Sequence, residues 1–306
     1  MASCIQRIVL STADVARLFN VTETTVKRWA DEGTLKCQKT PGGHRKFDVR
    51  FLVEFAEKNH FEPVGVLTIP EGDRLGQRIQ VAVLGRDFSG LVAAFVENAL
   101  SPDPNDLTQY LSYVYQHRVQ LWEIHDLIIR PGMEEIGARW SRGEIGVNHE
   151  HRASYETLEA LVKLQTQIRM KSQTGRSVVC SCLGDELHEI GLRCAAHLFE
   201  SEGWATTYLG ARTPVEALIT AIRETGPRIV SLSVTYVPPG GIPEKEFRWI
   251  ADAAREVNAE VILGGRGAQA LVHDPAWPAE PHASSRALLH SIEAIEKTDC
   301  TGWRKA

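Results

Sequence analysis

A strand followed directly by a histidine-bearing loop and a helix constrains this chain more than any other stretch. The apolar, β-branched run 177–183 predicts a buried strand, and the apolar spacing of 192–199 predicts a helix. His188 lies on the loop between them, at the carboxyl edge of a predicted parallel sheet, where open α/β folds bind ligands. Glu186 could hydrogen-bond one ring nitrogen of His188 and leave the other for a metal. Gly191 would let a large planar ligand approach the backbone.

Two further strands end in small residues at the same predicted edge. The strand over 229–234 leads through Ser233 into Thr235, and the next predicted strand ends at the diglycine of Gly264 and Gly265. The carboxyl ends of parallel strands meet at one edge of a sheet, so these residues are expected to lie beside the histidine loop.

The three elements together resemble the cobalamin-binding motif Asp-x-His-x-x-Gly, followed by Ser-x-Leu and Gly-Gly, in both order and spacing. The resemblance implies a cobalt corrinoid with His188 as the lower axial cobalt ligand, in place of the dimethylbenzimidazole base. Glu186 would orient His188, and Gly191 completes the first element. The displaced nucleotide tail would lie against Ser233, Thr235, Gly264 and Gly265. Glu186 stands where the family has Asp, and Thr235 where it has Leu, and neither departure removes the cobalt ligand.

Strand and helix patterns alternate from residue 176 to about residue 298. Short loops between them predict a doubly wound parallel sheet of the flavodoxin-like, Rossmann-type class. After the diglycine the pattern weakens. Residues 270–273 are expected to form the fifth strand and 284–296 the closing helix, while the proline-rich stretch 274–282 has no assigned role.

The first sixty residues carry a second strong pattern. Short amphipathic helices are predicted over 13–19 and 23–31, joined by a tight turn, with Thr22 capping the second helix. This is the pattern of a helix-turn-helix. The glycine-turned stretch 40–47 predicts a basic hairpin wing, and a third helix is expected over 49–58.

The segment resembles the winged helix-turn-helix of the MerR family, with its Trp-bearing second helix and its Gly-Gly-His-Arg wing. The resemblance implies binding to double-stranded operator DNA through base edges and phosphates. The residues expected to make these contacts are Thr24, Thr25, Lys27, Arg28, His44, Arg45 and Lys46. Residues 1–60 hold ten Lys or Arg against seven Asp or Glu, a net +3, so the remainder of this −5 chain carries −8. A basic head on an acidic body agrees with a DNA-binding module.

Residues 75–170 carry helical patterns almost throughout. An apolar stripe runs from Leu107 to Ile129, and another helical stretch spans 149–170. Breaks are expected at 84–86, 101–104, 131–132 and 143–146. Short loops between helices predict an antiparallel four-helix bundle.

Within this bundle, Trp140 is followed after nine residues by Glu150 and His151. The pattern Trp-x(9)-Glu-His resembles the signature of the light-sensing, adenosylcobalamin-dependent MerR-type repressors, the CarH group. The resemblance implies that Trp140 packs against the adenosyl group, while Glu150 and His151 contact it in the same upper pocket. Ser141 follows Trp140, where a histidine could reach cobalt after the upper ligand leaves. A second imidazole in the light state would then come from His149 or His151; otherwise water takes the site.

The patterns divide the chain into a winged helix-turn-helix with linker over 1–74, a four-helix-bundle cap domain over 75–173 and a cobalamin-binding α/β domain over 174–306. No apolar run reaches membrane-spanning length and no signal peptide opens the sequence, so a bacterial cytoplasmic protein, associated with the nucleoid when bound to DNA, is expected. The six cysteines include no Cys-x-x-Cys pair and are expected to be reduced thiols.

The resemblance to the CarH group spans all three domains in the same order. It implies a light-responsive repressor, not an enzyme, that binds adenosylcobalamin, assembles on operator DNA as a homo-oligomer in the dark (a tetramer is expected) and releases DNA when light breaks the cobalt–carbon bond. Three alternatives stay open: a cobalamin-responsive regulator without a light response, a regulator that binds another tetrapyrrole, and a corrinoid methyl-carrier subunit. The DNA-binding head argues against the last.

Overall fold

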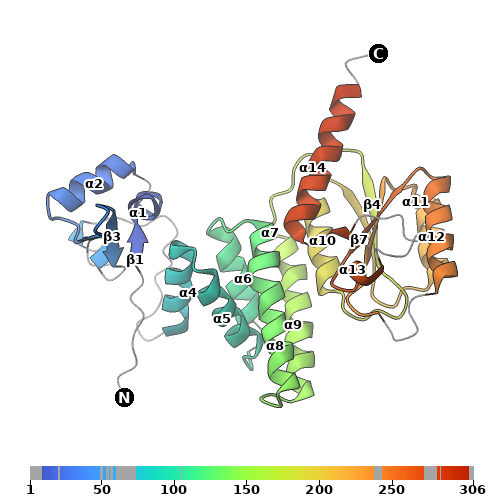
Figure 1. Cartoon of the computed structure of the whole chain (residues 1–306), viewed down its shortest axis with the longest axis horizontal. Helices are drawn as coiled ribbons and strands as arrows, with labels where there is room; N and C mark the ends of the chain where they lie inside the picture. Colours follow the sequence, from blue (N-terminus) through green and yellow to red (C-terminus); the bar gives the residue numbers. More distant parts are fainter. Residues whose placement is uncertain are drawn as a thin grey trace. The chain divides into compact units, whose positions relative to one another are not determined.

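The computed structural model describes residues 9–19, 21–48, 51–52, 55, 58–59, 74–103, 105–237, 243–271, 281–282 and 284–302. The chain forms two compact units. The first unit comprises residues 1–98 and 113–119, and the second comprises 99–112 and 120–306. Figure 1 shows the elements of each unit along the chain.

The first unit begins with a winged helix-turn-helix, as the sequence predicts. Its elements are β1 (Val9–Ser11), α1 (Thr12–Leu18), α2 (Glu23–Asp31), β2 (Gln38–Lys39) and β3 (Arg45–Asp48), followed by α4 (Arg74–Gly85) and α5 (Phe88–Ala99). Thr22 caps α2 by accepting a hydrogen bond from the backbone of Thr25 at 3.2 Å. Val26 of α2 is fully buried, and the Trp29 ring meets Phe19 edge-on with centroids 6.0 Å apart. These apolar contacts join the two helices of the motif.

The wing is a three-stranded antiparallel sheet in the order β1-β3-β2. The sequence patterns predict the β2–β3 hairpin but not β1, which pairs with β3 along its whole length. A strand of three residues is too short to show a period of two, so only its pairing partner reveals it. The expected third helix over 49–58 lies largely outside the described residues.

The second unit holds the first part of α6 (Asp106–Gln116), up to residue 112, together with α7 (Leu121–Glu123), the π-helix η1 (Ile124–Ile129), α8 (Arg130–Ser141) and α9 (Val147–Gln165). The break expected at 131–132 is wrong, because α7, η1 and α8 follow one another without interruption, and the break falls instead at 117–120. Arg118 has a φ of 63° there. Proline would clash with the carbonyl four residues earlier in an α-helix. The wider turn of η1, in which Arg130 donates to the carbonyl of His125, removes that clash ahead of Pro131.

The α/β part of the second unit is a five-stranded parallel sheet in the order β5-β4-β6-β7-β8, which confirms the predicted flavodoxin-like class. The strands are β4 (Ser177–Cys182), β5 (Ala205–Gly210), β6 (Ile229–Ser233), β7 (Glu260–Gly264) and β8 (Pro281–His282). The helices are α10 (Ile190–Ser201), α11 (Val215–Thr225), α12 (Glu244–Glu256), α13 (Ala268–Leu271) and α14 (Ser285–Gly302).

The fifth strand is not where the sequence pattern puts it. Residues 270 and 271 belong to α13, and residues 272 and 273 lie outside the described residues. The fifth strand is β8, where Pro281 and His282 pair with the end of β7. A four-residue apolar run has no period that separates a strand from a short helix, whereas pairing with β7 decides the assignment.

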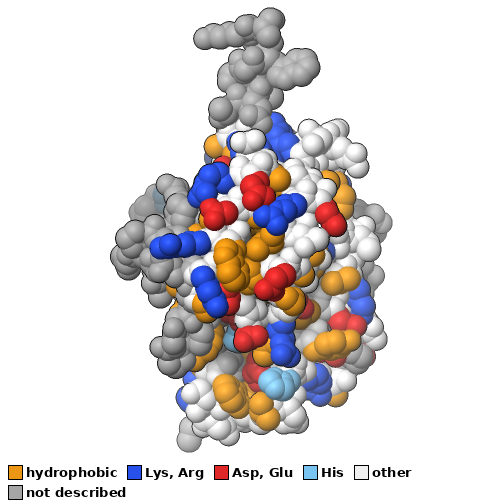
Figure 2. Space-filling view, turned by 90° about the vertical axis from the view of Figure 1, so that its right-hand side faces the viewer, with side chains coloured by type: hydrophobic (Ala, Val, Ile, Leu, Met, Phe, Trp, Pro, Cys, Tyr) orange, Lys and Arg blue, Asp and Glu red, His pale blue; other side chains and the backbone are white. Residues whose placement is uncertain are grey.

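Helices cover both faces of the sheet: α11 packs with α12, and α10 packs with α14. The core under α11 and α12 joins apolar residues of the strands, such as Val179 and Leu232, to Ile222 and Phe247 of the helices. Figure 2 shows the outer surface on this side, where charges of both signs surround apolar side chains. Within the part of the chain that the structure describes, no helix is long and apolar enough to cross a membrane.

Candidate functional site

The loop between β4 and α10 presents His188 at the carboxyl edge of the sheet. Its Nδ1 lies 2.6 Å from Oε1 of Glu186, and the side chain of His188 is 66% exposed while that of Glu186 is 2% exposed. The carboxylate therefore holds one ring nitrogen from below, and among the described residues the structure records no partner for Nε2. A histidine oriented by a carboxylate through its other nitrogen is the usual arrangement of an imidazole metal ligand.

The carboxylate of Glu186 also joins this loop to the loop after β6. Oε1 accepts the backbone N–H of His188 at 2.8 Å, and Oε2 accepts the backbone N–H groups of Thr235 at 2.6 Å and Tyr236 at 2.7 Å. Burial raises the pKa of the Glu186 carboxyl, but the hydrogen bonds from His188, Tyr236 and Thr235 outweigh burial and hold the pKa below its usual range. The carboxylate is therefore charged at neutral pH.

Small residues line the adjoining edge of the sheet. Ser233 of β6 is the register partner of Gly264 in β7. A Cβ at Gly191 would lie 3.9 Å from Oγ of Ser233, so the first turn of α10 faces the end of β6. A Cβ at Gly265 would meet the carbonyl oxygen of Val234 at 2.3 Å, and the φ of Gly265 is +92°. The two loops can approach this closely only because Gly265 has no side chain.

Two apolar side chains beside His188 are exposed, and the sequence patterns missed both. Leu187 is 62% exposed and Tyr236 is 59% exposed. Leu187 lies between Glu186 and His188 in the chain, and the backbone N–H of Tyr236 donates to Glu186. The sequence could have indicated Leu187, because this apolar residue stands directly between Glu186 and His188. It could not have indicated Tyr236, which is brought to this loop only by the hydrogen bond from its backbone to Glu186.

The residues of the predicted upper pocket lie at the ends of α8 and α9 that share one turn. Trp140 is 50% exposed near the end of α8, and Glu150 and His151 lie in the first turns of α9. Oε2 of Glu150 lies 2.8 Å from Nδ1 of His151, and Oε1 accepts a hydrogen bond from Ser154 at 2.9 Å. Glu150 and His151 are thus brought together in the structure.

Ser141, which follows Trp140, and His149, a possible cobalt ligand of the light state, are exposed at the same turn. For the described residues, no hydrogen bond, ion pair or ring contact joins Trp140 to Glu150 or His151, or either of these to His188. Their common role stays a prediction.

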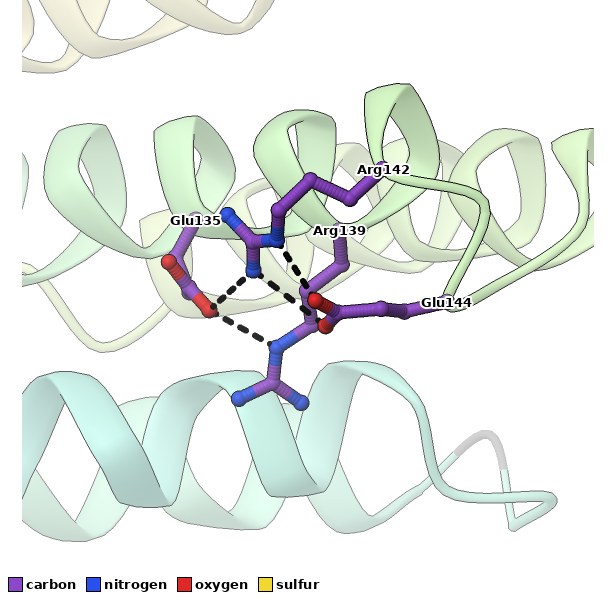
Figure 3. Close-up of polar contacts among 4 residues, drawn as sticks. All are labelled: Glu135, Arg139, Arg142 and Glu144. Atoms are coloured by element: carbon purple, nitrogen blue, oxygen red, sulfur yellow. Dashed lines mark hydrogen bonds and ion pairs between the residues drawn. The ribbon is translucent and has the colours of Figure 1, made fainter.

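A cluster of four charged side chains fixes the end of α8 on both sides of Trp140. Nε of Arg139 donates to Glu135 at 2.9 Å, and Arg142 reaches both Glu135 at 3.5 Å and Glu144 at 2.5 Å. Figure 3 shows the two arginines between the two carboxylates. The arginine hydrogen bonds hold the pKa values of Glu135 and Glu144 below their usual range. The cluster ties the turn after α8 back onto the helix.

Four of the seven predicted DNA-contacting residues line a cavity of about 590 Å³ in the first unit, between α2 and the wing. Lys27, His44, Arg45 and Lys46 line it, together with Glu23 and Thr40. Thr24, Thr25 and Arg28 are also on α2, and Thr24 and Arg28 are exposed.

Arg45 forms a two-point ion pair with an acidic residue of α2. Nη2 of Arg45 donates to both oxygens of Asp31 at 2.6 and 2.9 Å, and this contact holds the pKa of Asp31 below its usual range. The pair fastens the wing to α2, so the structure gives Arg45 a positioning role alongside its predicted phosphate contact.

Comparison with known proteins agrees with the geometry in all three parts of the chain. The helix-turn-helix domain family matches residues 9–60, and two families described as B12 binding domains match residues 91–164 and 176–274. The chain is a helix-turn-helix protein with B12-binding domains.

Two curated proteins of Myxococcus xanthus are similar to this helix-turn-helix, B12-binding protein. The HTH-type transcriptional repressor CarH is 27% identical over 231 residues, which cover 71% of this chain and 76% of CarH. The HTH-type transcriptional repressor CarA is 29% identical over 145 residues, 47% of each chain. Among solved structures, the Methanosarcina barkeri monomethylamine corrinoid protein superposes with a TM-score of 0.55 at 11% identity, covering 68% of this chain and 99% of that one, and this likeness concerns the fold alone. The expectation of a regulator rather than an enzyme agrees with the two repressors.

The residues of the sheet edge fit a cobalamin. His188 offers one nitrogen to a metal, which would suit a corrin because the macrocycle would bring the cobalt with ligands of its own. The glycines at 191, 264 and 265 place no side chain at three positions of the edge, and the exposed Leu187 and Tyr236 on the neighbouring loops would offer apolar contacts to a planar ring.

Proposed function

We propose that this cobalamin-binding transcriptional repressor senses light through adenosylcobalamin, binds operator DNA as a homo-oligomer in the dark and releases it in the light. The observation that carries the proposal is the Glu186–His188 pair, in which Glu186 holds Nδ1 of His188 and leaves Nε2 for a metal. This pair occurs in a protein that also has a winged helix-turn-helix. The domain limits that go with it are 1–74 for the DNA-binding head, 75–173 for the bundle and 174–306 for the α/β domain. A cytoplasmic site of action follows from DNA as the partner.

The lower half of the site would be held by the α/β domain. His188 ligates cobalt, Glu186 fixes its tautomer by accepting from Nδ1, and the edge formed by Ser233, Thr235, Gly264 and Gly265 receives the nucleotide tail. Because Glu186 also holds the backbone of Thr235 and Tyr236, the cobalt ligand and the tail-binding loop are positioned by one carboxylate.

The upper half would be supplied by α8 and α9. Trp140 offers an exposed aromatic face on which an adenine can stack. Glu150 can accept a hydrogen bond from a ribose hydroxyl, and His151 is held against it. When bound, adenosylcobalamin supplies a cobalt–carbon bond that visible light can cleave. Loss of the adenosyl group removes the partner of Trp140 and Glu150, which would shift the balance between assembled and dissociated protein.

Assembly would control DNA binding through effective concentration. One winged helix-turn-helix makes few base contacts, whereas several heads on one oligomer bind a repeated operator together. A tetramer in the dark is proposed, in line with the family resemblance.

The deciding experiment compares the protein reconstituted with adenosylcobalamin in the dark and after green light. Absorption spectra and size-exclusion profiles are recorded for the wild type and for the His188→Ala and Trp140→Ala variants. A spectral change with a fall in oligomer size, abolished in His188→Ala and reduced in Trp140→Ala, is the expected result. Tight cobalamin binding without any change of assembly in light would refute the light response, and absence of binding would refute the cobalamin site.

A cobalamin-responsive regulator without a light response is the second candidate. Ser141 favours it, since an exposed hydroxyl next to Trp140 is a poor cobalt ligand and leaves His149, His151 or water to occupy the vacated position. A reconstituted protein that binds operator equally well in the dark and after illumination, but only with cobalamin, would support this candidate.

A further inference from the structure

A buried arginine on α10 lies between the two parts of the second unit. The side chain of Arg193 is 9% exposed and its guanidinium stacks over the Tyr208 ring, 5.1 Å from the centroid. Nε donates to Nε2 of His197 at 3.2 Å, and Nη2 donates to Oε1 of Gln165 and lies 3.5 Å from Oε2 of Glu200. A buried guanidinium with partners on several elements fixes those elements because leaving any of its N–H groups unpaired is unfavourable.

Gln165 is the last residue of α9 and completes the link. Its Oε1 accepts from Arg193, while its Nε2 donates to Oε2 of Glu200 at 2.7 Å. Both ends of the amide are therefore held by α10, so α9 can neither slide along its axis nor turn about it without breaking one of these part-buried hydrogen bonds. We call this set of Gln165, Arg193 and Glu200 the α9–α10 tie.

The tie connects the two proposed halves of the cofactor site. α10 begins two residues after His188, and the N-terminal turns of α9 carry Glu150 and His151. Glu150 and Gln165 lie on the same helix, α9, and a rise of 1.5 Å per residue places Glu150 roughly 22 Å from the tie. A turn of 20° about the helix axis would move a side-chain group about 6 Å from that axis by about 2 Å. A displacement of this size removes a hydrogen bond.

We propose that Arg193 is a positioning residue which, through Gln165, sets the orientation of α9 and thereby the selectivity of the site for the group above cobalt. This inference rests on the proposed function. Arg193 touches neither His188 nor Glu150 in the structure and acts through α9. The lower half of the site does not depend on the tie, because Glu186 and its backbone partners hold His188 from the loop after β6.

The test is a comparison of dissociation constants for adenosylcobalamin and methylcobalamin, which differ only in the upper group, measured by absorption titration in the dark. The variants are Arg193→Met, Gln165→Leu and the double variant. The control is Arg223→Met, which removes an exposed two-point ion pair with Glu256 at 2.8 and 3.0 Å. In wild type and control, adenosylcobalamin is expected to bind more tightly than methylcobalamin.

Each single variant is expected to lower this preference about tenfold, equal to about 1.4 kcal/mol, with methylcobalamin affinity unchanged within twofold. The double variant is expected to lose no more than either single one, since both changes break the same tie. Amide exchange in the cofactor-free protein is expected to speed up over 147–155 in the variants. If Arg193→Met does not fold, Gln165→Leu still tests the proposal, because it breaks the same tie at the end of a helix, where a substitution disturbs the fold less.

The outcomes separate the two proposals. A wild type that does not prefer adenosylcobalamin contradicts the proposed function. A wild-type preference that survives in all variants overturns the role of Arg193, as does an equal loss of affinity for both cobalamins, which would mark a purely structural residue.

Discussion

Two buried histidines should make the second unit sensitive to mild acid. His125 of η1 and His197 of α10 are 3% and 0% exposed, with ring centroids 5.9 Å apart. Within the described residues, three ring nitrogens have no hydrogen-bond partner: both nitrogens of His125 and Nδ1 of His197. Burial lowers the pKa of His125 to about 3, and burial together with the nearby His125 and Arg193 lowers that of His197 to about 2. Both rings are therefore neutral in the folded protein.

The size of the effect follows from linkage. Unfolding restores a pKa near 6.5, so the unfolded chain binds more protons than the folded one at any pH below that value. Stability is fully present above the unfolded pKa and is lost as the pH falls below it. At pH 5 each histidine contributes a loss of about 2 kcal/mol, or about 4 kcal/mol for the pair, relative to pH 7. The size of this loss is set by the unfolded pKa, because both folded pKa values lie well below 5 and neither ring is protonated in the folded protein at pH 5.

Hydrogen exchange of peptides within α10 measures the effect in the full chain. The opening free energy is determined at pH 7 and pH 5 after correction for intrinsic exchange rates, for wild type and for His125→Leu, His197→Leu and the double variant. The difference between the two pH values is the readout, so a change in overall stability does not confuse it. Each single variant should reduce the difference by about 2 kcal/mol and the double variant by about 4 kcal/mol.

His290 provides the matched control, because it lies exposed on α14 and meets water in both states. His290→Gln should leave the pH difference unchanged. A double variant that keeps the wild-type pH difference, or a wild type that loses less than about 1 kcal/mol between pH 7 and pH 5, would refute the reasoning.

Three further predictions concern the proposed sites. Gly265→Ala should lower the free energy of unfolding, measured by urea titration, by about 3 kcal/mol, because the new Cβ would meet the Val234 carbonyl at 2.3 Å and the φ of this residue is positive. Gly264→Ala is the control and should change the free energy of unfolding little, because its nearest contact would be at 3.8 Å. Glu186→Gln should weaken cobalamin binding about 10- to 100-fold in an absorption titration, with Glu186→Asp closer to wild type; equal affinities would deny the carboxylate its role. Lys27→Ala should weaken binding to all DNA sequences and reduce the slope of log K against log salt by about 1, whereas a loss confined to one operator would make Lys27 a base-reading residue.

The elements that the sequence determined are those whose partners are close in the chain. Glu186 and His188 are two residues apart on one short loop, so their hydrogen bond follows from the spacing alone. Thr22 caps α2 for the same reason. Strand and helix periods in the α/β domain predict the parallel sheet, because the apolar runs of β4 and β6, which are buried along nearly their whole length, alternate with amphipathic helices.

The tertiary structure alone decided the contacts that cross between elements. Asp126 in η1 accepts the backbone N–H groups of Ser285 and Arg286 and so caps α14 from a distant part of the chain. Gln165 meets Arg193, and His125 meets His197, across a packing interface that no local pattern encodes. Side chains at such an interface are brought together by the burial of apolar surface on both elements, which is non-directional, and their pairing depends on the final register of the helices.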